Sequence, residues 1–118
     1  MRCAFALALL LWALTGSAEA RCHSTAWRSH WGIETAAFME TDGAACTTSV
    51  SRVWNTSEVH SVNIASAPQN GTASASGRKV SYRPRPGFKG TDSFVFAILG
   101  QKAGRAQRAT VRVSVTVR

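Results

Sequence analysis

The last nine residues of the chain constrain its fold more than any other segment. Valine occupies every second position from Val111 to Val117, and Thr, Arg or Ser fills the positions between and around them. Because the side chains of a β-strand point alternately to opposite faces, this pattern predicts a strand with one buried and one polar face. β-branched valine suits a pleated sheet better than a helix. The segment from Thr110 to Arg118 is therefore predicted to be a strand packed on a core.

A second strand is predicted from Asp92 to Leu99. Phe94, Phe96 and Ile98 would point to one face, and the residues between them are also apolar. A strand that is apolar on both faces belongs at the centre of its sheet. The three large side chains would face the core, where burial of each contributes about 2 kcal/mol.

A strand from Val80 to Tyr82 is predicted to end at a turn-rich corner. Pro84 and Pro86 fix φ and lack a backbone N–H group, so they cannot continue a fully paired strand. Pro86 is followed by Gly87, and Pro-Gly is a turn dipeptide. These residues predict a sharp corner between this strand and the strand that begins at Asp92.

Three residues of the corner have specific predicted roles. Phe88 is an aromatic residue within a turn and is predicted to reach back to the core. Gly90 is predicted to adopt a positive φ or to allow a close backbone approach. Asp92 is predicted to accept hydrogen bonds from the backbone N–H groups of the corner.

These motifs resemble those of the bacterial immunoglobulin-like and cadherin-like repeat domains. The shared motifs are a Pro-x-x-Gly-Thr turn from Pro68, the Tyr-x-Pro corner, a Gly-Thr-Asp-Ser-Phe segment and the valine strand, which together cover the chain from about Val59 to Val117. The resemblance implies an all-β, antiparallel immunoglobulin-like β-sandwich of about seven strands, used for adhesion, spacing or binding and not for catalysis. The residues that carry this fold motif are Tyr82, Pro84, Gly87, Phe88, Gly90, Asp92 and Phe94.

The chain departs from that family in two ways. Such domains usually occur in tandem, whereas here there is one copy. Many of them carry Asp-Gly in the hairpin after the Phe-x-Phe strand, but this hairpin runs from Leu99 to Gly104 without a carboxylate, and Lys102 and Arg105 lie near its tip. These differences argue against a calcium role, and no metal or cofactor is predicted.

The first twenty residues have the pattern of a signal peptide. Arg2 forms a short basic region, the segment from Cys3 to Leu14 is apolar, and Ala18-Glu19-Ala20 is a small-x-small cleavage site. The apolar run is shorter than the ~20 residues that a membrane-spanning helix needs. We therefore predict a signal peptide over residues 1–20 and one β-sandwich domain over residues 21–118. The domain is expected in the periplasm or outside the cell, with no transmembrane segment after cleavage.

Two cysteines, Cys22 and Cys46, remain after this cleavage. In an oxidising compartment such a pair predicts a disulfide, which would stabilise a small domain by about 3 kcal/mol. The alternative is a metal site that combines these cysteines with His23 and His30. Their spacing matches no structural zinc pattern, so the disulfide is preferred.

The segment before Gly77 gives weaker signals. A hairpin is predicted from Thr35 to Trp54, with Asp42–Gly43 as its turn and a return strand, Cys46–Val53, broken by a bulge or a short helical turn. A further strand is predicted from about His60, and Thr72–Ser76 is predicted to be a short polar edge strand.

Trp27 and Trp31 allow two interpretations. Either tryptophan could cover an open end of the sandwich, or the pair could form an exposed aromatic platform for a glycan or a protein partner. The sequence favours the first interpretation without excluding the second.

The chain is strongly basic, with 14 Lys and Arg against 6 Asp and Glu and a net charge of +8. Ten of the cationic residues follow Gly77, where Asp92 is the only acidic residue. Such a field attracts polyanions, although basic charge also keeps a small exported domain soluble. Specific nucleic-acid recognition is not expected, because aromatic residues do not interleave with the cations. The predicted polyanion contacts are Arg78, Arg83, Arg85, Arg105 and Arg112.

Catalysis is not predicted. The carboxylates are scattered, the cysteines are assigned to a disulfide, and the chain lacks the common nucleophile, zinc-protease and phosphate-loop motifs. The leading hypothesis is a bacterial, non-enzymatic, exported module for cell-envelope or adhesive protein binding, with an unknown protein or envelope glycan as its partner. A basic module for anionic glycans or lipid head groups, and an enzyme inhibitor that presents a loop such as Arg85–Lys89, are the alternatives.

Overall fold

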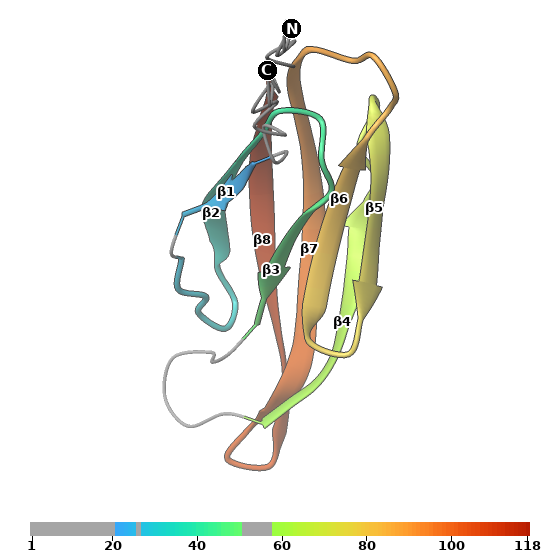
Figure 1. Cartoon of the computed structure of the whole chain (residues 1–118). Coiled ribbons are helices and arrows are strands. Elements are labelled where there is room, and N and C mark those ends of the chain that lie inside the picture. Colours follow the sequence, from blue (N-terminus) through green and yellow to red (C-terminus); the bar gives the residue numbers. More distant parts are fainter. Residues whose placement is uncertain (1–20, 26, 51–57) are drawn as a thin grey trace, which may run out of the picture.

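The computed structural model describes residues 21–25, 27–50 and 58–118. These residues form two β-sheets and no helix, and the sheets face each other as the layers of a sandwich (Figure 1). The predicted immunoglobulin-like β-sandwich is confirmed. The described residues form eight strands: β1 (Cys22–Ser24), β2 (Glu34–Thr41), β3 (Cys46–Ser49), β4 (Glu58–Ser66), β5 (Gly71–Ser76), β6 (Lys79–Pro84), β7 (Gly90–Lys102) and β8 (Arg105–Val117).

The strands divide unequally between the two sheets. The larger sheet has the order β1-β2-β8-β7-β4, and the smaller has the order β3-β6-β5. Neighbouring strands are antiparallel except for β2 and β8, which run parallel. Parallel neighbours cannot be joined by a hairpin, and β2 and β8 meet this requirement because they come from opposite ends of the domain sequence.

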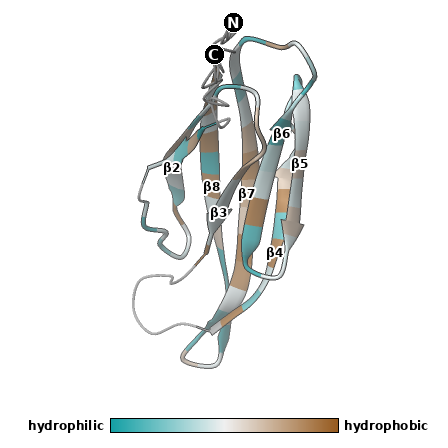
Figure 2. Cartoon of the chain, viewed as in Figure 1, coloured by the Kyte–Doolittle hydropathy of each residue, from teal (hydrophilic) through white to brown (hydrophobic). Residues whose placement is uncertain are grey.

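The β7–β8 pair forms the centre of the larger sheet. Phe94 lies opposite Val113, and Phe96 lies opposite Val111, so the predicted apolar faces of the two strands coincide in the core. Polar and apolar residues alternate along β8, whereas the middle of β7 is apolar on both faces (Figure 2). Both predicted strands are confirmed, and both extend beyond their predicted ends into a hairpin whose turn contains Ala103 and Gly104, each with positive φ.

The predicted hairpin between Thr35 and Trp54 is wrong. β2 pairs with β1 and β8 in the larger sheet, whereas β3 pairs with β6 in the smaller one. Asp42–Gly43 therefore carries the chain from one sheet to the other. Met39 and Cys46 are buried whether their strands are neighbours in one sheet or lie in two facing sheets. The alternation of apolar residues therefore does not reveal which of these two arrangements the strands adopt. The predicted end of the return strand, Val53 and Trp54, lies outside the described residues.

The edge strands β4 and β5 agree with their predicted positions. β4 begins at Glu58, two residues before the predicted start, and its register shifts between Val59 and Ser61. This β-bulge explains why Val59 is out of phase with Val62 in the sequence. β5 is an edge strand of the smaller sheet, as predicted.

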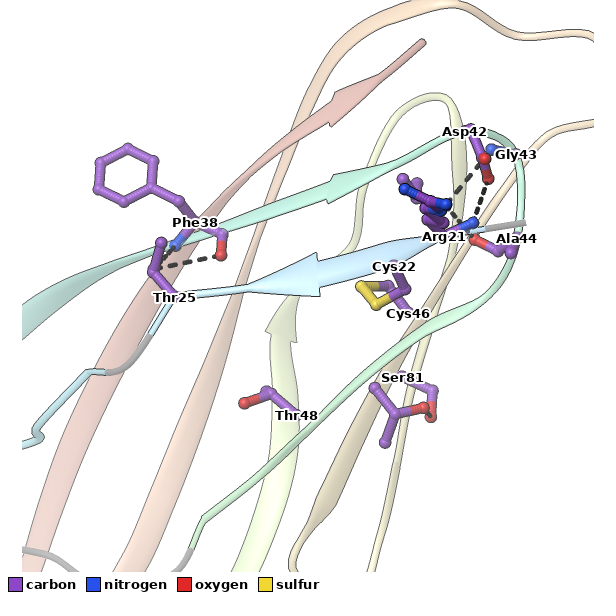
Figure 3. The surroundings of a disulfide bond; sticks show 12 residues. Arg21, Cys22, Thr25, Phe38, Asp42, Gly43, Ala44, Cys46, Thr48 and Ser81 are labelled. Carbon is purple, nitrogen blue, oxygen red and sulfur yellow. Dashed lines mark hydrogen bonds between the residues drawn. A yellow bond between two sulfur atoms is a disulfide. The ribbon is translucent and has the colours of Figure 1, made fainter. Parts of the chain in front are cut away.

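The predicted disulfide is confirmed, and it joins the two sheets. Cys22 lies on β1 at the edge of the larger sheet, and Cys46 lies on β3 at the edge of the smaller one (Figure 3). Their Cα atoms are 5.2 Å apart, and Cys46 is fully buried. The bridge therefore closes one open side of the sandwich and excludes the alternative metal site.

Replacing both cysteines with alanine should lower the free energy of unfolding by about 3 kcal/mol, because the bridge restricts the unfolded chain. Chemical denaturation of the oxidised protein and the Cys22→Ala/Cys46→Ala variant measures the difference. Cys22→Ala alone should lose about as much, since it also breaks the bridge. Coincident unfolding curves of the oxidised and reduced wild-type protein would show that the bridge does not stabilise the fold.

Candidate functional site

The Asp92 carboxylate ties the two sheets together at one end of the sandwich. Asp92 lies on β7 and accepts a hydrogen bond from the Tyr82 hydroxyl on β6 at 2.8 Å. It also accepts hydrogen bonds from the backbone N–H groups of Gln69, Asn70 and Ser93, at 3.1, 3.0 and 2.9 Å. Gln69 and Asn70 belong to the turn between β4 and β5, which connects the larger sheet to the smaller.

This arrangement partly corrects the prediction for Asp92. Its carboxylate does bind backbone N–H groups, but those of Gln69 and Asn70 belong to the preceding turn and not to the corner that leads into β7. The sequence separation of more than twenty residues hides this contact, because the pairing of the strands must be known before the turn can be placed beside β7.

The hydrogen bonds oppose the effect of burial on the acidity of Asp92. Burial alone would raise the pKa of the carboxyl, but the Tyr82 hydroxyl and the amides of Ser93, Asn70 and Gln69 together hold the pKa below its ordinary value. Burial, followed by the hydrogen bond to Asp92 and its charge, raises the pKa of the Tyr82 phenol above its usual range. Asp92 is therefore ionised and Tyr82 neutral at physiological pH, which suits a fixed structural contact.

Gly71 allows the turn to approach Tyr82. A Cβ atom at this position would lie 2.4 Å from the backbone oxygen of Arg83 and 2.8 Å from the Tyr82 hydroxyl. Tyr82 is fully buried and stacks on Phe94 with ring centroids 5.8 Å apart. The Pro-x-x-Gly-Thr turn and the Tyr-x-Pro corner are thus two halves of one packed contact.

The corner begins two residues later than predicted, because β6 continues to Pro84, which pairs with Gly71. Phe88 and Gly90 have the predicted geometry. Phe88 is half-buried and packs against the core. Gly90 has a φ of 138°, and a Cβ atom there would meet the Phe88 ring at 3.4 Å. The Arg85 guanidinium lies 5.8 Å from the centroid of the same ring. The fold-motif residues therefore serve stability and leave little of their chemistry free for a ligand.

The tryptophans pack against the core. Trp27 is half-buried, donates a hydrogen bond from Nε1 to the Thr48 hydroxyl at 3.1 Å, and meets Phe96 edge to face at 5.5 Å. Trp31 is also half-buried and packs against the core. This geometry fits the interpretation that they cover an open side of the sandwich.

A shallow hollow of about 220 Å³ lies on the outer face of the larger sheet, and the sequence does not reveal it. Phe38 lies in its lining and is 55% exposed. Figure 3 shows Phe38 beside Thr25, with its ring directed away from the disulfide. Thr25 holds the β2 backbone there, because its N–H donates to the Phe38 carbonyl at 3.0 Å and its hydroxyl accepts from the Phe38 N–H at 3.2 Å. The residues that line the hollow are His23, Thr25, Phe38, Met39, Glu40, Ser114 and Thr116.

Two ion pairs flank the hollow on the same sheet face. Arg112 donates from Nε to Glu34 at 2.9 Å, and Arg118 pairs with Glu40. The pairs are exposed, so each stabilises the fold by less than about 1 kcal/mol. Phe38 is thus an apolar centre between polar, charge-balanced surroundings. The alternation along β2 leaves open which side chains face outward. Phe38 is identified as outward-facing only once its sequence neighbours Ala37 and Met39 are known to be buried.

The five predicted polyanion contacts do not gather on one surface. Arg105 lies near the tip of the β7–β8 hairpin, and Arg112 is paired with Glu34 on the outer face of the larger sheet. Arg78 lies in the β5–β6 turn, Arg83 on β6 and Arg85 directly after β6. Of the five, only Arg78, Arg83 and Arg85 lie along the same strand, β6, or at its ends.

The outer face of the smaller sheet carries only hydroxyl and cationic side chains. The register places Lys79, Ser81 and Arg83 of β6 beside alternate residues of β3 and β5. None of the carboxylates whose side chains are described lies there, since Glu34 and Glu40 belong to the larger sheet, Asp42 to a turn and Asp92 to the core side. We call this surface the hydroxyl–cation face; its residues are Thr47, Ser49, Thr72, Ser74, Ser76, Lys79, Ser81 and Arg83.

Neither a metal-binding cluster nor a membrane-spanning helix is found in the described part of the chain. No group of three or more His, Cys, Asp or Glu residues that could hold a metal ion occurs among residues 21–25, 27–50 and 58–118. The same residues include no helix with the length and apolarity needed to cross a bilayer.

Comparison with protein families gives a match over most of the chain. The model of the bacterial Ig domain family matches residues 31–116, which include β2 to β7 and nearly all of β8. No curated protein matches the chain.

Replacing Asp92 with asparagine should lower the free energy of unfolding at neutral pH by about 2 kcal/mol, because the carboxylate binds several donors and an amide cannot accept from them all. The lowered pKa means that this contribution is present above the unfolded pKa, near 4, and is lost as the pH falls through the folded value. The gap between the wild type and Asp92→Asn should therefore narrow below about pH 4.

Denaturation across a pH series measures this gap, and Tyr82→Phe serves as the control. Tyr82→Phe removes one donor but keeps the carboxylate, so part of the acid dependence should remain. A gap between wild type and Asp92→Asn that stays constant from neutral pH to pH 3 would contradict the assigned role of the ionised carboxylate.

Proposed function

The chain belongs to the bacterial Ig domain family, and we propose that it acts as an exported, non-enzymatic module that binds a protein partner in the cell envelope or at an adhesive contact. Domains of this family are generally non-catalytic. The proposal rests above all on one observation, the exposed Phe38 ring in a hollow of the larger sheet.

The surroundings of Phe38 have the anatomy of a protein-binding surface. Such surfaces combine an apolar or aromatic centre with a polar rim, and aromatic anchors contribute much of their binding energy. Here the centre is Phe38, and the rim consists of hydroxyl groups and the Glu34–Arg112 and Glu40–Arg118 pairs. Because the rim charges are balanced, binding at this surface should depend on shape and apolar contact more than on long-range attraction.

Export is supported by the sequence and is compatible with the disulfide. The signal-peptide pattern precedes Arg21, and the Cys22–Cys46 bridge requires an oxidising compartment to form and persist. The periplasm and the extracellular space both meet this requirement, and both present envelope proteins as partners.

Replacing Phe38 with serine should abolish capture of the partner while leaving stability nearly unchanged, because the ring is 55% exposed. Affinity capture from the envelope fraction at low and high salt, followed by mass spectrometry, measures the effect. We expect proteins retained by the wild type at high salt to be absent with Phe38→Ser.

Ile33→Ser is the matched control. Ile33 is 58% exposed, similar to Phe38, but does not line the hollow. The Ile33→Ser variant should therefore capture the partner as the wild type does. If all three proteins capture the same set, or if the wild type retains nothing at high salt, the proposed contact through Phe38 is wrong.

A further inference from the structure

Two pairs of cations on opposite sheets differ in whether carboxylates offset their charge. On the larger sheet, Arg112 and Arg118 each lie against a glutamate. On the hydroxyl–cation face, Lys79 and Arg83 have no carboxylate beside them among the described side chains. The positive charge of the hydroxyl–cation face is therefore unbalanced among the described side chains, whereas the charges of Arg112 and Arg118 are offset by glutamates.

The side chains of the hydroxyl–cation face are regularly spaced. Lys79 and Arg83 point outward from the central strand, four residues apart, which corresponds to about 13 Å along a strand. Ser81 lies between them and exchanges a hydrogen bond with Thr47 on β3 at 2.9 Å. Hydroxyl residues of β3 and β5 flank both cations. Arg78 and Arg85 extend the positive charge at the two ends of β6.

We propose that the hydroxyl–cation face binds an extended acidic polysaccharide. The two cations pair with carboxylate groups that recur along the polymer, and the serine and threonine hydroxyls, which both donate and accept, hydrogen-bond to the sugar hydroxyls. A sheet face on which small hydroxyl side chains surround two cations suits a ribbon-like chain that lies along β6.

The same face is poorly suited to the other common polyanions. Its residues include no aromatic or large apolar side chain. Single-stranded nucleic acids need aromatic surfaces for base stacking, and binding to a lipid surface needs apolar groups that enter the interface. An acidic polysaccharide can be bound through its carboxylates and hydroxyl groups, without aromatic stacking surfaces or apolar groups that enter a lipid interface. This site is separate from the Phe38 hollow, which lies on the other sheet, so it stands or falls independently of the protein contact proposed above.

Binding to polygalacturonate, measured by fluorescence anisotropy across a salt series, tests the proposal. Neutral dextran is the uncharged control polymer. We expect binding to polygalacturonate that weakens steeply with salt and no binding to dextran. Lys79→Gln/Arg83→Gln should weaken binding roughly tenfold and reduce the slope of log affinity against log salt by about 2, one for each lost ion contact.

The matched control is Lys102→Gln/Arg105→Gln, which also removes one lysine and one arginine charge, but from the tip of the β7–β8 hairpin. It should change the affinity less than about twofold, since screening limits the reach of exposed charges. Phe38→Ser should bind polygalacturonate as the wild type does. Equal losses in both double variants would mean that net charge alone causes binding and would overturn the assignment of the face.

Three further results would also overturn the proposal. They are binding to dextran as strong as to polygalacturonate, the absence of binding to polygalacturonate, and preferential binding to phosphatidylglycerol vesicles that depends on Lys79 and Arg83. The last result would replace the polysaccharide with a lipid surface as the occupant of the face.

A different observation concerns the start of the domain. The backbone nitrogen of Arg21 donates a hydrogen bond to Oδ1 of Asp42 at 2.7 Å, and the Asp42 N–H donates to the Arg21 carbonyl at 3.2 Å (Figure 3). The Thr41 hydroxyl donates to the Ala44 carbonyl at 2.7 Å and accepts from the Gly43 N–H, which fixes the turn that carries Asp42. The carboxylate is thus held beside the atom that follows the predicted cleavage site.

The geometry points to Asp42 as the binding partner of a new N-terminus. Hydrolysis of the Ala20–Arg21 peptide bond by a signal peptidase adds water, leaves a carboxylate on Ala20 and frees the Arg21 nitrogen as an α-ammonium group. The existing hydrogen bond then becomes an ion pair with Asp42, directly beside the Cys22–Cys46 bridge. Maturation would therefore tighten β1 on the sandwich, next to the cysteine that forms the disulfide.

This second proposal is tested by intact mass and by a thermodynamic cycle. Protein purified from the exported fraction should begin at Arg21. Acetylation of that α-amine should raise the unfolding equilibrium constant about two- to fivefold in the wild type and leave Asp42→Asn unchanged. A different N-terminal residue, or the same effect of acetylation in both proteins, would overturn it.

Discussion

One carboxylate joins the two sheets of this domain at one end of the sandwich. Asp92 projects from β7 of the larger sheet, binds the Tyr82 hydroxyl on β6 of the smaller sheet, and binds the turn through which the chain passes between the sheets. The hydrogen bonds offset the cost of partial burial and keep the carboxylate ionised. With this contact fixed, Tyr82 stacks on Phe94 and closes the core at that end.

The disulfide complements this contact at a different edge. Asp92 joins central strands of the two sheets through hydrogen bonds, whereas Cys22 and Cys46 join edge strands through a covalent bond. Between these two ties the core is formed by the apolar faces of β7 and β8, and Trp27 covers the side near β3. The sandwich thus has little need of its outer faces for stability.

This division leaves the two outer faces free to differ. The face of the larger sheet carries paired charges around an exposed aromatic ring, and the hydroxyl–cation face carries cations without carboxylates among the described side chains. A balanced, partly apolar surface favours a protein partner, and an unbalanced, hydroxyl-rich surface favours an acidic polymer. One small domain can therefore present two kinds of contact on opposite sheets.

The sequence by itself determined the positions of β2 to β8, the corner and the disulfide, but not β1. Alternating valines, the Pro-Gly turn and the pair of cysteines are local signals, and each depends on a few neighbouring residues or on simple counting. The Tyr-x-Pro and Gly-Thr-Asp-Ser-Phe motifs also identified the class of domain, which the family match confirms. The positions of Phe88 and Gly90 followed from the same local chemistry.

Only the tertiary structure decided which strands pair and what lies beside each surface residue. Asp42–Gly43 has the sequence of a hairpin turn, yet it connects two sheets, because alternation fixes which side chains are buried and not the partner that buries them. For the same reason the sequence could not distinguish the surroundings of Arg112 from those of Arg83. Arg112 pairs with Glu34, 78 residues away in the sequence, whereas Arg83 lies beside hydroxyl groups. Charge balance depends on distances in space, and those distances are set when the sheets assemble.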